Sequence, residues 1–405
     1  MNSLYRDHRL HKLLIANTLS SVGTGITMTA VPWLMIQKNG GETILGYITT
    51  IMTVIMFVLT PYIGMWIDRF SRKSILLFGE AIGLTITALF VFIGMIGEYQ
   101  IWHLTILFAS GSLYYFLFYP TLFAFNQELF SRKQYKALNG VMEIQGQLAT
   151  VVSGGMASVM IEKIPFVWIL SFDMLTYIAA FLCILLIPYE RSVRRESHVS
   201  FKEKMLEGYR YMKQRPSLFW FFLASLMPFI TVMMTNYLHP IYIADVLKED
   251  GSVYGIQSMV YGLGAALAGF VVPILMKRMS TEATVVLNVG ICAFAISMFL
   301  LFEQTSIFYI LVVLTAFGNA GARVARSSLM MERIPNDKIG RVDSLFRTLG
   351  FMIRSLLISV FTGAVSAQHI LFPYAVLSVL LVVSTLIVLK FSSFMKKEHN
   401  ISGTL

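Results

Sequence analysis

The sequence has little charge for its length. Asp, Glu, Lys and Arg together make up 13% of the 405 residues, whereas 56% of the residues are hydrophobic. A soluble domain carries about a quarter charged residues, and its core is too small to bury this much apolar sequence. The composition therefore excludes an ordinary soluble protein and predicts that lipid covers the excess.

The sequence also lacks the groups on which most enzymes and metalloproteins depend. Its two cysteines, Cys183 and Cys292, both fall inside apolar runs, so we expect neither a disulfide nor a metal site. No phosphate loop ending in Gly-Lys-Ser/Thr occurs, and the polar connections are too short for an ATPase domain. No nucleophile, base and orienting group occur together in the loops. We therefore predict a protein that is not an enzyme, has no catalytic residue, metal or cofactor, and draws its energy from a gradient.

Long apolar runs dominate the chain, and each is close to the roughly 20 residues that span a bilayer as a helix. The runs are continuous, which excludes a strand barrel, and no cleavage site follows the first run. The predicted helices cover 10–36, 43–66, 74–97, 102–124, 137–161, 165–188, 218–246, 252–276, 282–301, 306–330, 338–365 and 371–391.

The basic residues are distributed unevenly between the connections. The chain has 32 Lys and Arg against 22 Asp and Glu. Most of the basic residues lie at the termini and in connections on one side, and only Lys38, Lys163 and Lys248 lie in connections on the other. Because basic loops stay in the cytoplasm, we expect cytoplasmic termini and a multi-pass protein of the cell (inner or plasma) membrane. Membrane topology explains the positive charge, so no nucleic-acid partner is expected.

Two sets of six predicted helices are separated by a charged segment. We expect an N-terminal bundle at 1–188, a cytoplasmic linker at 189–217, a C-terminal bundle at 218–391 and a cytoplasmic tail at 392–405. An apolar stripe on a basic helix in the linker is typical of a helix that lies along the lipid surface. The residues of this stripe are Phe201, Met205, Tyr209 and Met212.

The two halves show weak internal repetition, in which Glu128 aligns with Glu332 and Gly146 with Gly350. A parallel repeat of six plus six helices predicts a substrate site between the halves, near the bilayer midplane. The predicted fold class is an all-α polytopic membrane protein of 12 transmembrane helices in two six-helix bundles, and we expect a monomer.

A glycine and a group of charged residues follow the second predicted helix, in the stretch Gly64-Met65-Trp66-Ile67-Asp68-Arg69-Phe70-Ser71-Arg72-Lys73. This stretch resembles the loop motif of the major facilitator superfamily. The resemblance implies a conformational latch formed by Gly64, Asp68, Arg69, Arg72 and Lys73. Gly64 would permit close helix approach, and Asp68 would accept charge-assisted hydrogen bonds when the cytoplasmic side is closed. The alternative is a solvated turn that obeys the positive-inside rule.

Three further stretches resemble the enterobactin-exporter and macrolide-efflux branch of this superfamily. They are Val31-Pro32-Trp33-Leu34, Phe172-Asp173-Met174-Leu175-Thr176-Tyr177, and Glu207-Gly208-Tyr209-Arg210-Tyr211 followed by Arg215-Pro216. The branch implies export of small molecules, typically driven by proton entry. It includes exporters of siderophores and of metallophores such as staphylopine, alongside antibiotic pumps.

Carboxylates within the predicted helices are candidates for proton coupling, because ionisable groups are costly in a membrane. Glu143 is our first candidate and Asp173 the second. We expect Glu80, near the start of the third helix, to form a salt bridge with a loop residue. For Glu143, pairing with a loop arginine near the cytoplasmic surface remains an equal alternative.

Arginines within the predicted helices are candidates for substrate binding, because their forked donors suit carboxylate or phosphate. They are Arg323, Arg347 and Arg354, whereas Arg326 is close enough to a helix end to reach the surface. The alternative is a scaffold in which these arginines neutralise Glu143 and Glu332. Further candidates among the uncharged polar side chains are Tyr119, Asn236, Tyr237 and Tyr261.

We therefore predict a proton-coupled secondary exporter that works by alternating access on a small, anionic molecule such as a siderophore or a staphylopine-like metallophore. A multidrug or macrolide efflux pump is the first alternative. A lipid flippase or a membrane enzyme is an alternative of another class.

Overall fold

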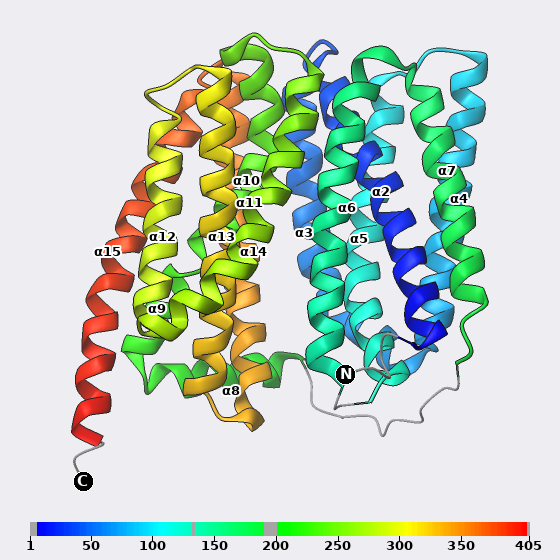
Figure 1. Ribbon diagram of the computed structural model, residues 1–405. Helices are drawn as coiled ribbons and strands as arrows, with labels where there is room; N and C mark the ends of the chain where they lie inside the picture. The colour runs from blue at the N-terminus through cyan, green and yellow to red at the C-terminus, as the bar shows by residue number, and fades with distance from the viewer. Residues whose placement is uncertain (1–5, 132–133, 190–200, 403–405) are drawn as a thin grey trace. The chain divides into compact units, whose positions relative to one another are not determined.

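The computed structural model describes residues 6–131, 134–189 and 201–402, and in these ranges it contains helices and no strands (Figure 1). Within this described part, 12 helices are long and apolar enough to cross a membrane. The prediction of an all-α polytopic membrane protein is therefore confirmed. Large apolar side chains such as Phe78, Phe92 and Phe294 are exposed along these helices, as lipid-facing residues are.

The chain divides into two compact units. Unit 1 comprises Met1–Ser197 together with Glu249–Met259, and unit 2 comprises His198–Lys248 and Val260–Leu405. The helices of unit 1 are α2 (His8–Ile36), α3 (Gly41–Arg69), α4 (Arg72–Ile96), α5 (Ile101–Leu129), α6 (Tyr135–Lys163) and α7 (Phe166–Leu185). These bounds match the first six predicted helices to within a few residues, except that several helices extend further at their ends.

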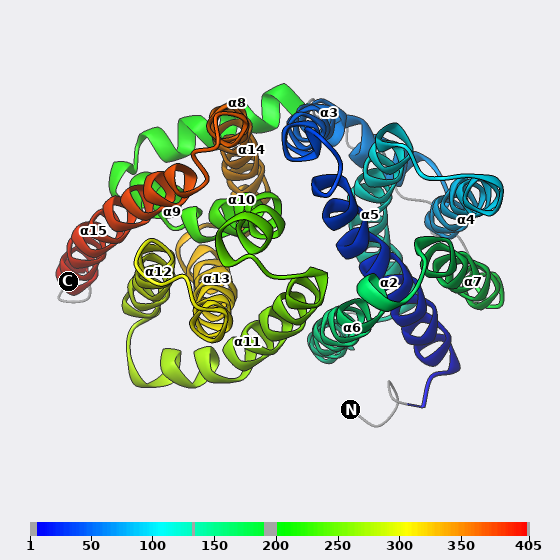
Figure 2. The same ribbon diagram turned by 90° about the horizontal axis from the view of Figure 1, so that it is seen from above.

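Helix α2 is the central element of unit 1, where it contacts α3, α5, α6 and α7, while α4 packs against α5 and α7 (Figure 2). Two glycines allow this close packing. A Cβ atom at Gly23 would lie 2.0 Å from Oγ1 of Thr176 on α7, and one at Gly25 would lie 2.8 Å from Oγ of Ser153 on α6. Small residues at such positions let transmembrane helices approach each other closely.

Unit 2 contains α8 (Phe201–Lys213), α9 (Pro216–Ala224), α10 (Met227–Tyr242), the π-helical turn η2 (Ile243–Leu247), most of α11 (Gly251–Arg278), α12 (Thr281–Met298), α13 (Thr305–Arg333), α14 (Asn336–Ser366) and α15 (Leu371–Ser402). The predicted single helix at 218–246 is thus broken into α9, α10 and η2. Pro228 lies in the first turn of α10 and Pro240 near its end, where each lacks a backbone donor. Lys248 then ends the segment in a left-handed conformation.

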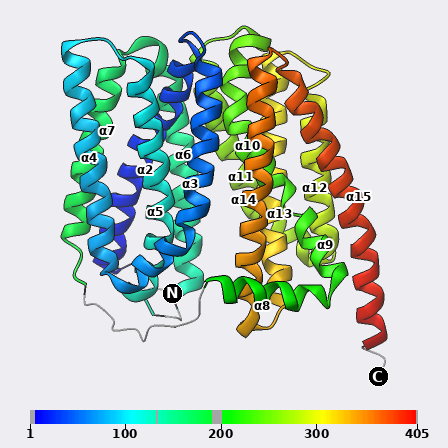
Figure 3. The same ribbon diagram turned by 180° about the vertical axis from the view of Figure 1, so that it is seen from behind.

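The linker helix α8 packs across α14 (Figure 3). A Cβ atom at Gly208 would lie 2.5 Å from the backbone oxygen of Arg341, so the two backbones touch here. Met212 is buried, but Tyr209 is 47% exposed, so these two members of the predicted apolar stripe do not share one environment. Protein therefore covers one face of α8, and the placement of this helix along the lipid surface stays a prediction.

Helix α15 continues without a break from Leu371 to Ser402, past the predicted end at residue 391. The good helix formers Met395, Lys396 and Lys397 lie in this extension, and no glycine or proline interrupts residues 392–402.

Candidate functional site

Helix α2 carries a stripe of hydroxyl groups into the core of unit 1. Ser20, Thr24 and Thr27 are four and three residues apart, a spacing that places them on one face of a helix. All three are buried. The stripe thus faces other helices of the unit, and its hydroxyls contact two buried carboxylates.

Asp173 on α7 is the first of these carboxylates, and it is 2% exposed. The Thr27 hydroxyl donates to its Oδ2 over 2.7 Å, and Oδ1 lies 3.5 Å from Oγ1 of Thr24 and 3.4 Å from Oγ1 of Thr176. Thr24 also donates to the hydroxyl of Tyr177 over 3.0 Å. Three threonines and a tyrosine thus surround a carboxylate that the sequence placed among the proton-coupling candidates.

Glu80 on α4 is the second carboxylate, and it is 0% exposed. The Tyr114 hydroxyl donates to its Oε1 over 2.7 Å, and Ser20 Oγ lies 3.4 Å from its Oε2. The expected salt bridge with a loop residue is therefore wrong for Glu80. Glu80 lies more than two turns inside α4, too deep for a loop side chain to reach, because α4 begins at Arg72 and not at residue 74 as predicted.

Neither carboxylate has a cation beside it. Among the ion pairs of the described chain, none includes Glu80 or Asp173. Their neighbours are hydroxyl groups and the rings of Tyr114 and Tyr177, which meet edge to face with centroids 5.4 Å apart. A buried carboxylate without a cation is costly in a membrane, which makes both residues candidates for a functional role.

Glu143 on α6, our first coupling candidate, is exposed and accepts a hydrogen bond of 3.0 Å from Nε2 of Gln147. Its neighbour Gln145 is the buried member of this polar group and accepts a short hydrogen bond from Asn17 on α2. Asp173 and Glu80 are therefore buried, whereas Glu143 is exposed.

The stretch from Gly64 to Lys73, which resembles the loop motif of the superfamily, is mostly helical. Gly64 and Arg69 lie in α3, Arg72 and Lys73 begin α4, and only Phe70 and Ser71 connect the two helices. A Cβ atom at Gly64 would meet no described atom within 4 Å, so the close helix approach expected of this glycine stays a prediction. Asp68 lies in the last turn of α3, but its side chain, and hence its predicted latch role, lies outside what the structure describes.

Arg72 and Lys73, at the start of α4, bind to groups at the ends of α5 and α7 in unit 1. Arg72 is buried and forms an ion pair with Glu128 on α5, to which the Tyr189 hydroxyl also donates. Partial burial raises the pKa of Tyr189, and its bond to Glu128 adds to this effect. Nζ of Lys73 donates to the backbone oxygens of Leu185 and Ile187 at the end of α7, each over 2.8 Å. The remaining exposed cation of the motif, Arg69, lies over the ring of Phe70.

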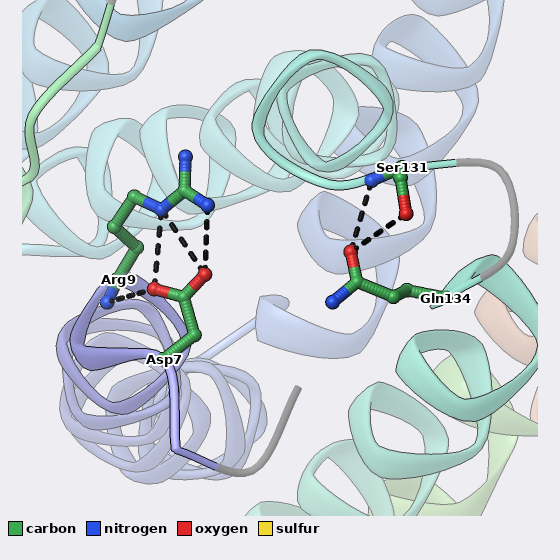
Figure 4. Close-up of polar contacts among 4 residues, drawn as sticks. All are labelled: Asp7, Arg9, Ser131 and Gln134. Carbon is green, nitrogen blue, oxygen red and sulfur yellow. Dashed lines mark hydrogen bonds and ion pairs between the residues drawn. The ribbon is translucent and has the colours of Figure 1, made fainter. Parts of the chain in front are cut away.

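The start of α2 lies against the connection between α5 and α6 (Figure 4). Asp7 caps α2 by accepting from the backbone N–H of Arg9 over 2.8 Å, and the Arg9 guanidinium bonds to the same carboxylate. The guanidinium also lies over the ring of Phe130, 5.7 Å from its centroid. In the adjoining turn, Ser131 donates from its backbone N–H and its hydroxyl to Oε1 of Gln134.

The predicted arginines of unit 2 do not form one group. Arg347 on α14 is exposed and pairs with Asp343 one turn earlier, at 3.0 Å. Arg326 on α13 interacts electrostatically with Asp343, Arg323 and Arg347. Asp343 is therefore the acidic partner in this group, a residue that sequence reasoning missed although it precedes Arg347 by four residues, a favourable ion-pair spacing.

Arg354 lies two turns further along α14 in a different environment. Its Nη1 is 3.8 Å from the sulfur of Met233 on α10, and its Nε is buried without a hydrogen-bond partner in the described part of the chain. No described carboxylate pairs with it. The expected neutralising scaffold is thus not seen at Arg354 in the described part of the chain.

The uncharged candidates occupy different environments. In unit 2, Tyr261 accepts a hydrogen bond of 2.9 Å from Asn319. Asn236 is exposed and Tyr237 is buried. In unit 1, Tyr119 is 54% exposed and stacks on Tyr115.

The described residues contain no group of three His, Cys, Asp or Glu that could hold a metal ion. Cys183 and Cys292 are free cysteines.

The fold and its buried polar core define a polytopic membrane transporter, and comparisons with known proteins identify its family. The family model of the Major Facilitator Superfamily matches residues 13–358. The chain therefore belongs to this superfamily, and it is a transporter and not an enzyme.

Curated relatives are similar over most of their length. The chain is 19% identical to macrolide efflux protein A of Streptococcus pyogenes over 368 residues, which cover 89% of this chain and 91% of that protein. It is 20% identical to macrolide efflux protein A of Enterococcus faecalis over 293 residues, which cover 71% of this chain and 90% of that protein.

Solved structures share the fold. A mutant of the nucleoside transporter NupG matches with a TM-score of 0.76 at 11% identity, covering 95% of this chain and 100% of that one. A bacterial homologue of the iron transporter ferroportin, in an inward-facing state, matches with a TM-score of 0.73 at 15% identity, covering 95% and 98%. At such identities these likenesses establish the fold alone.

Proposed function

We propose that this transporter is a secondary exporter that moves a small molecule out of the cell by alternating access, in exchange for protons. The observation that carries the proposal is Asp173, which is buried among threonines with no cation. Such an acid is neutral when buried and releases its proton when the surroundings open to water. The macrolide efflux proteins, which resemble this chain over most of its length, support the outward direction.

The substrate in this proposal carries an anionic group, as a siderophore or metallophore does. Arg354 supports this choice, because its buried Nε lacks a partner and its guanidinium contacts only a methionine sulfur among the described polar groups. An arginine in this setting is costly unless a carboxylate or phosphate satisfies its donors. We further propose a monomer in the plasma membrane with both termini in the cytoplasm, in keeping with the positive connections.

Macrolide efflux is the second candidate, and the named relatives are the specific observation in its favour. Exposed aromatic side chains such as Tyr119 supply the apolar contact that a large drug needs.

The first experiment identifies the exported compound and the coupling together. Untargeted comparison of small molecules inside and outside cells with and without the protein should reveal one anionic compound that accumulates inside when the protein is absent. Proteoliposomes that contain the protein should then lose a pH gradient when this compound, or erythromycin as the rival probe, is added. Lipid scrambling without loss of the gradient would contradict the proposal.

Two variants test the assigned roles in the same proteoliposomes. Asp173→Asn should abolish the response to the pH gradient, whereas Glu98→Gln, in the exposed connection before α5, should behave as the wild type. Arg354→Ala should lower uptake of the anionic compound about tenfold or more, the effect of one charge-assisted hydrogen bond of roughly 1.5–3 kcal/mol. Transport of that compound at the normal rate would contradict the anionic site, and Arg278→Ala at an exposed helix end is the matched control.

A further inference from the structure

Unit 1 contains one buried acid, Glu80, that neither the family resemblance nor the coupling role of Asp173 explains. We propose that Glu80 is a second proton-binding carboxylate, packed close to Asp173 by the side chains of α2, α5 and α7, so that the two acids titrate as one coupled pair. This inference rests on the proposed proton coupling and adds a second acid to it.

The hydrogen bonds around Glu80 form a chain that can conduct a proton. Tyr114 donates to Oε1 of Glu80 over 2.7 Å, and Ser20 Oγ lies 2.6 Å from the same tyrosine oxygen. Since Tyr114 uses its hydrogen on Glu80, Ser20 must donate to Tyr114 when Glu80 is ionised. When Glu80 is protonated, both bonds can reverse direction with only hydroxyl rotations, and the proton of Glu80 then points at Tyr114.

Helix α2 also carries a hydroxyl group that lies beside Asp173. Thr24 lies one turn after Ser20 on the same face, and it donates to Tyr177 over 3.0 Å with Oδ1 of Asp173 at 3.5 Å. The rings of Tyr114 and Tyr177 are in contact, and a Cβ atom at Gly83 would lie 2.4 Å from the Tyr177 ring. Gly83 is one turn after Glu80 on α4, so the glycine lets Tyr177 lie against the helix that carries Glu80.

The charges of this cluster make the two acids interdependent. The groups that face Glu80 are Ser20 from α2, Tyr114 from α5, and Tyr177 and Asp173 from α7. None of them is a cation. Two buried carboxylates with no cation beside them repel each other when both are ionised. The loss of a proton from one acid therefore strengthens proton binding at the other.

A purely structural role predicts something different. A permanently neutral Glu80 that only bonds Tyr114 would keep its proton at all working pH values, and its replacement by glutamine would leave Asp173 unchanged. A coupled acid titrates, and each member changes the titration of the other by the same amount because the coupling free energy is reciprocal.

Infrared difference spectroscopy on the full-length protein in lipid nanodiscs separates these cases without any substrate. The carbonyl stretch of a protonated buried carboxyl should appear for both acids and disappear as the pH is raised. Glu80→Gln should remove one band and displace the pH midpoint of the other by about one unit, and Asp173→Asn should produce an equal displacement of the Glu80 band. Glu98→Gln is the control, with both bands unchanged.

A milder variant keeps the test open if Glu80→Gln does not fold. Tyr114→Phe removes one hydrogen bond, so it should shift the frequency of the Glu80 band and leave that of Asp173 in place. Bands that titrate independently, or a Glu80 band that never titrates, would overturn the inference even when transport is proton-coupled. If the two bands titrate as a coupled pair but transport does not depend on the pH gradient, the proposed function is overturned instead.

Discussion

Both units bury an ion pair near a helix end, but unit 1 also buries two carboxylates that no cation of the described chain pairs with. Unit 1 buries Glu80 and Asp173 among hydroxyl groups with no cation beside them. In unit 2 the buried carboxylate Glu282 lies at the start of α12 and is paired with Arg333 at 2.7 Å. The helix cores of unit 2 instead use neutral amides, with Asn288 fully buried on α12.

Two halves with the same arrangement of helices can therefore have different roles in one transporter. A core with uncompensated acids changes its charge when protons arrive, and a core of amides and aromatic rings does not. Arg354, whose Nε has no hydrogen-bond partner in the described chain, lies in unit 2. In the proposed function, unit 1 binds protons and unit 2 recognises an anion.

The largest expected effect comes from breaking the buried ion pair of unit 1. Arg72→Ala leaves Glu128 without its cation and should lower the free energy of unfolding by about 3–5 kcal/mol. Arg347→Ala removes the exposed ion pair with Asp343, which lies one helical turn earlier on α14 of unit 2. It should lower the free energy of unfolding by less than about 0.5 kcal/mol. Denaturant unfolding in detergent compares the two variants. Similar losses of unfolding free energy in the two variants would show that the ion pair of Arg72 and Glu128 is not buried as described.

A carboxylate placed in the neutral core of unit 2 should be the next most damaging change. The Nδ2 of Asn288 donates to the backbone oxygen of Thr284 over 2.8 Å. Asn288→Asp loses this donor and should cost about 1–3 kcal/mol or more, because a buried polar group is left unsatisfied. Asp173→Asn should cost less, since the amide oxygen still accepts from Thr27. Thermal unfolding of the purified variants decides the order, and the reverse order would break the comparison.

The positions of the helices could be predicted because hydrophobic runs and basic loops follow from the membrane itself. The acid core could be predicted only in part. Asp173 stood out within a stretch resembling other exporters, but Glu80 looked like a surface residue because its partners, Ser20 and Tyr114, are 60 and 34 residues away in the chain. The break in the seventh span depends on how Pro228 and Pro240 pack, which hydropathy does not report.

A smaller loss should follow from filling the close contact between α2 and α7. Gly23→Ala places a methyl group 2.0 Å from Oγ1 of Thr176 and 2.7 Å from Oδ1 of Asp173, and overpacking of this kind costs about 1–3 kcal/mol. Gly64→Ala, where the methyl group meets nothing nearby, should be neutral or stabilising by up to about 1 kcal/mol. Differential scanning calorimetry measures both. Equal melting temperatures would mean that the acid core tolerates separation of its helices.

The smallest effect is expected outside the membrane, at the cap of α2. Asp7→Ala should cost about 1 kcal/mol at neutral pH through loss of the cap. The side-chain hydrogen bond from Arg9 lowers the pKa of Asp7, so its stabilisation is present above its unfolded value and is lost as the pH falls through the folded value. Melting curves at neutral pH should separate the variant from the wild type, and the difference should shrink as the pH falls below the ordinary Asp value of about 3.9. A difference that persisted in acid would assign the stabilisation to another group.

Helix α15 has a consequence for how the protein can be handled. Its 32 residues make a rod about 48 Å long, against a hydrocarbon thickness of about 30 Å. The last turns must therefore stand clear of the lipid. A fluorescent reporter fused after Leu405 would be carried on a stiff stalk away from the bilayer, where its signal would reveal which compartment the C-terminus enters.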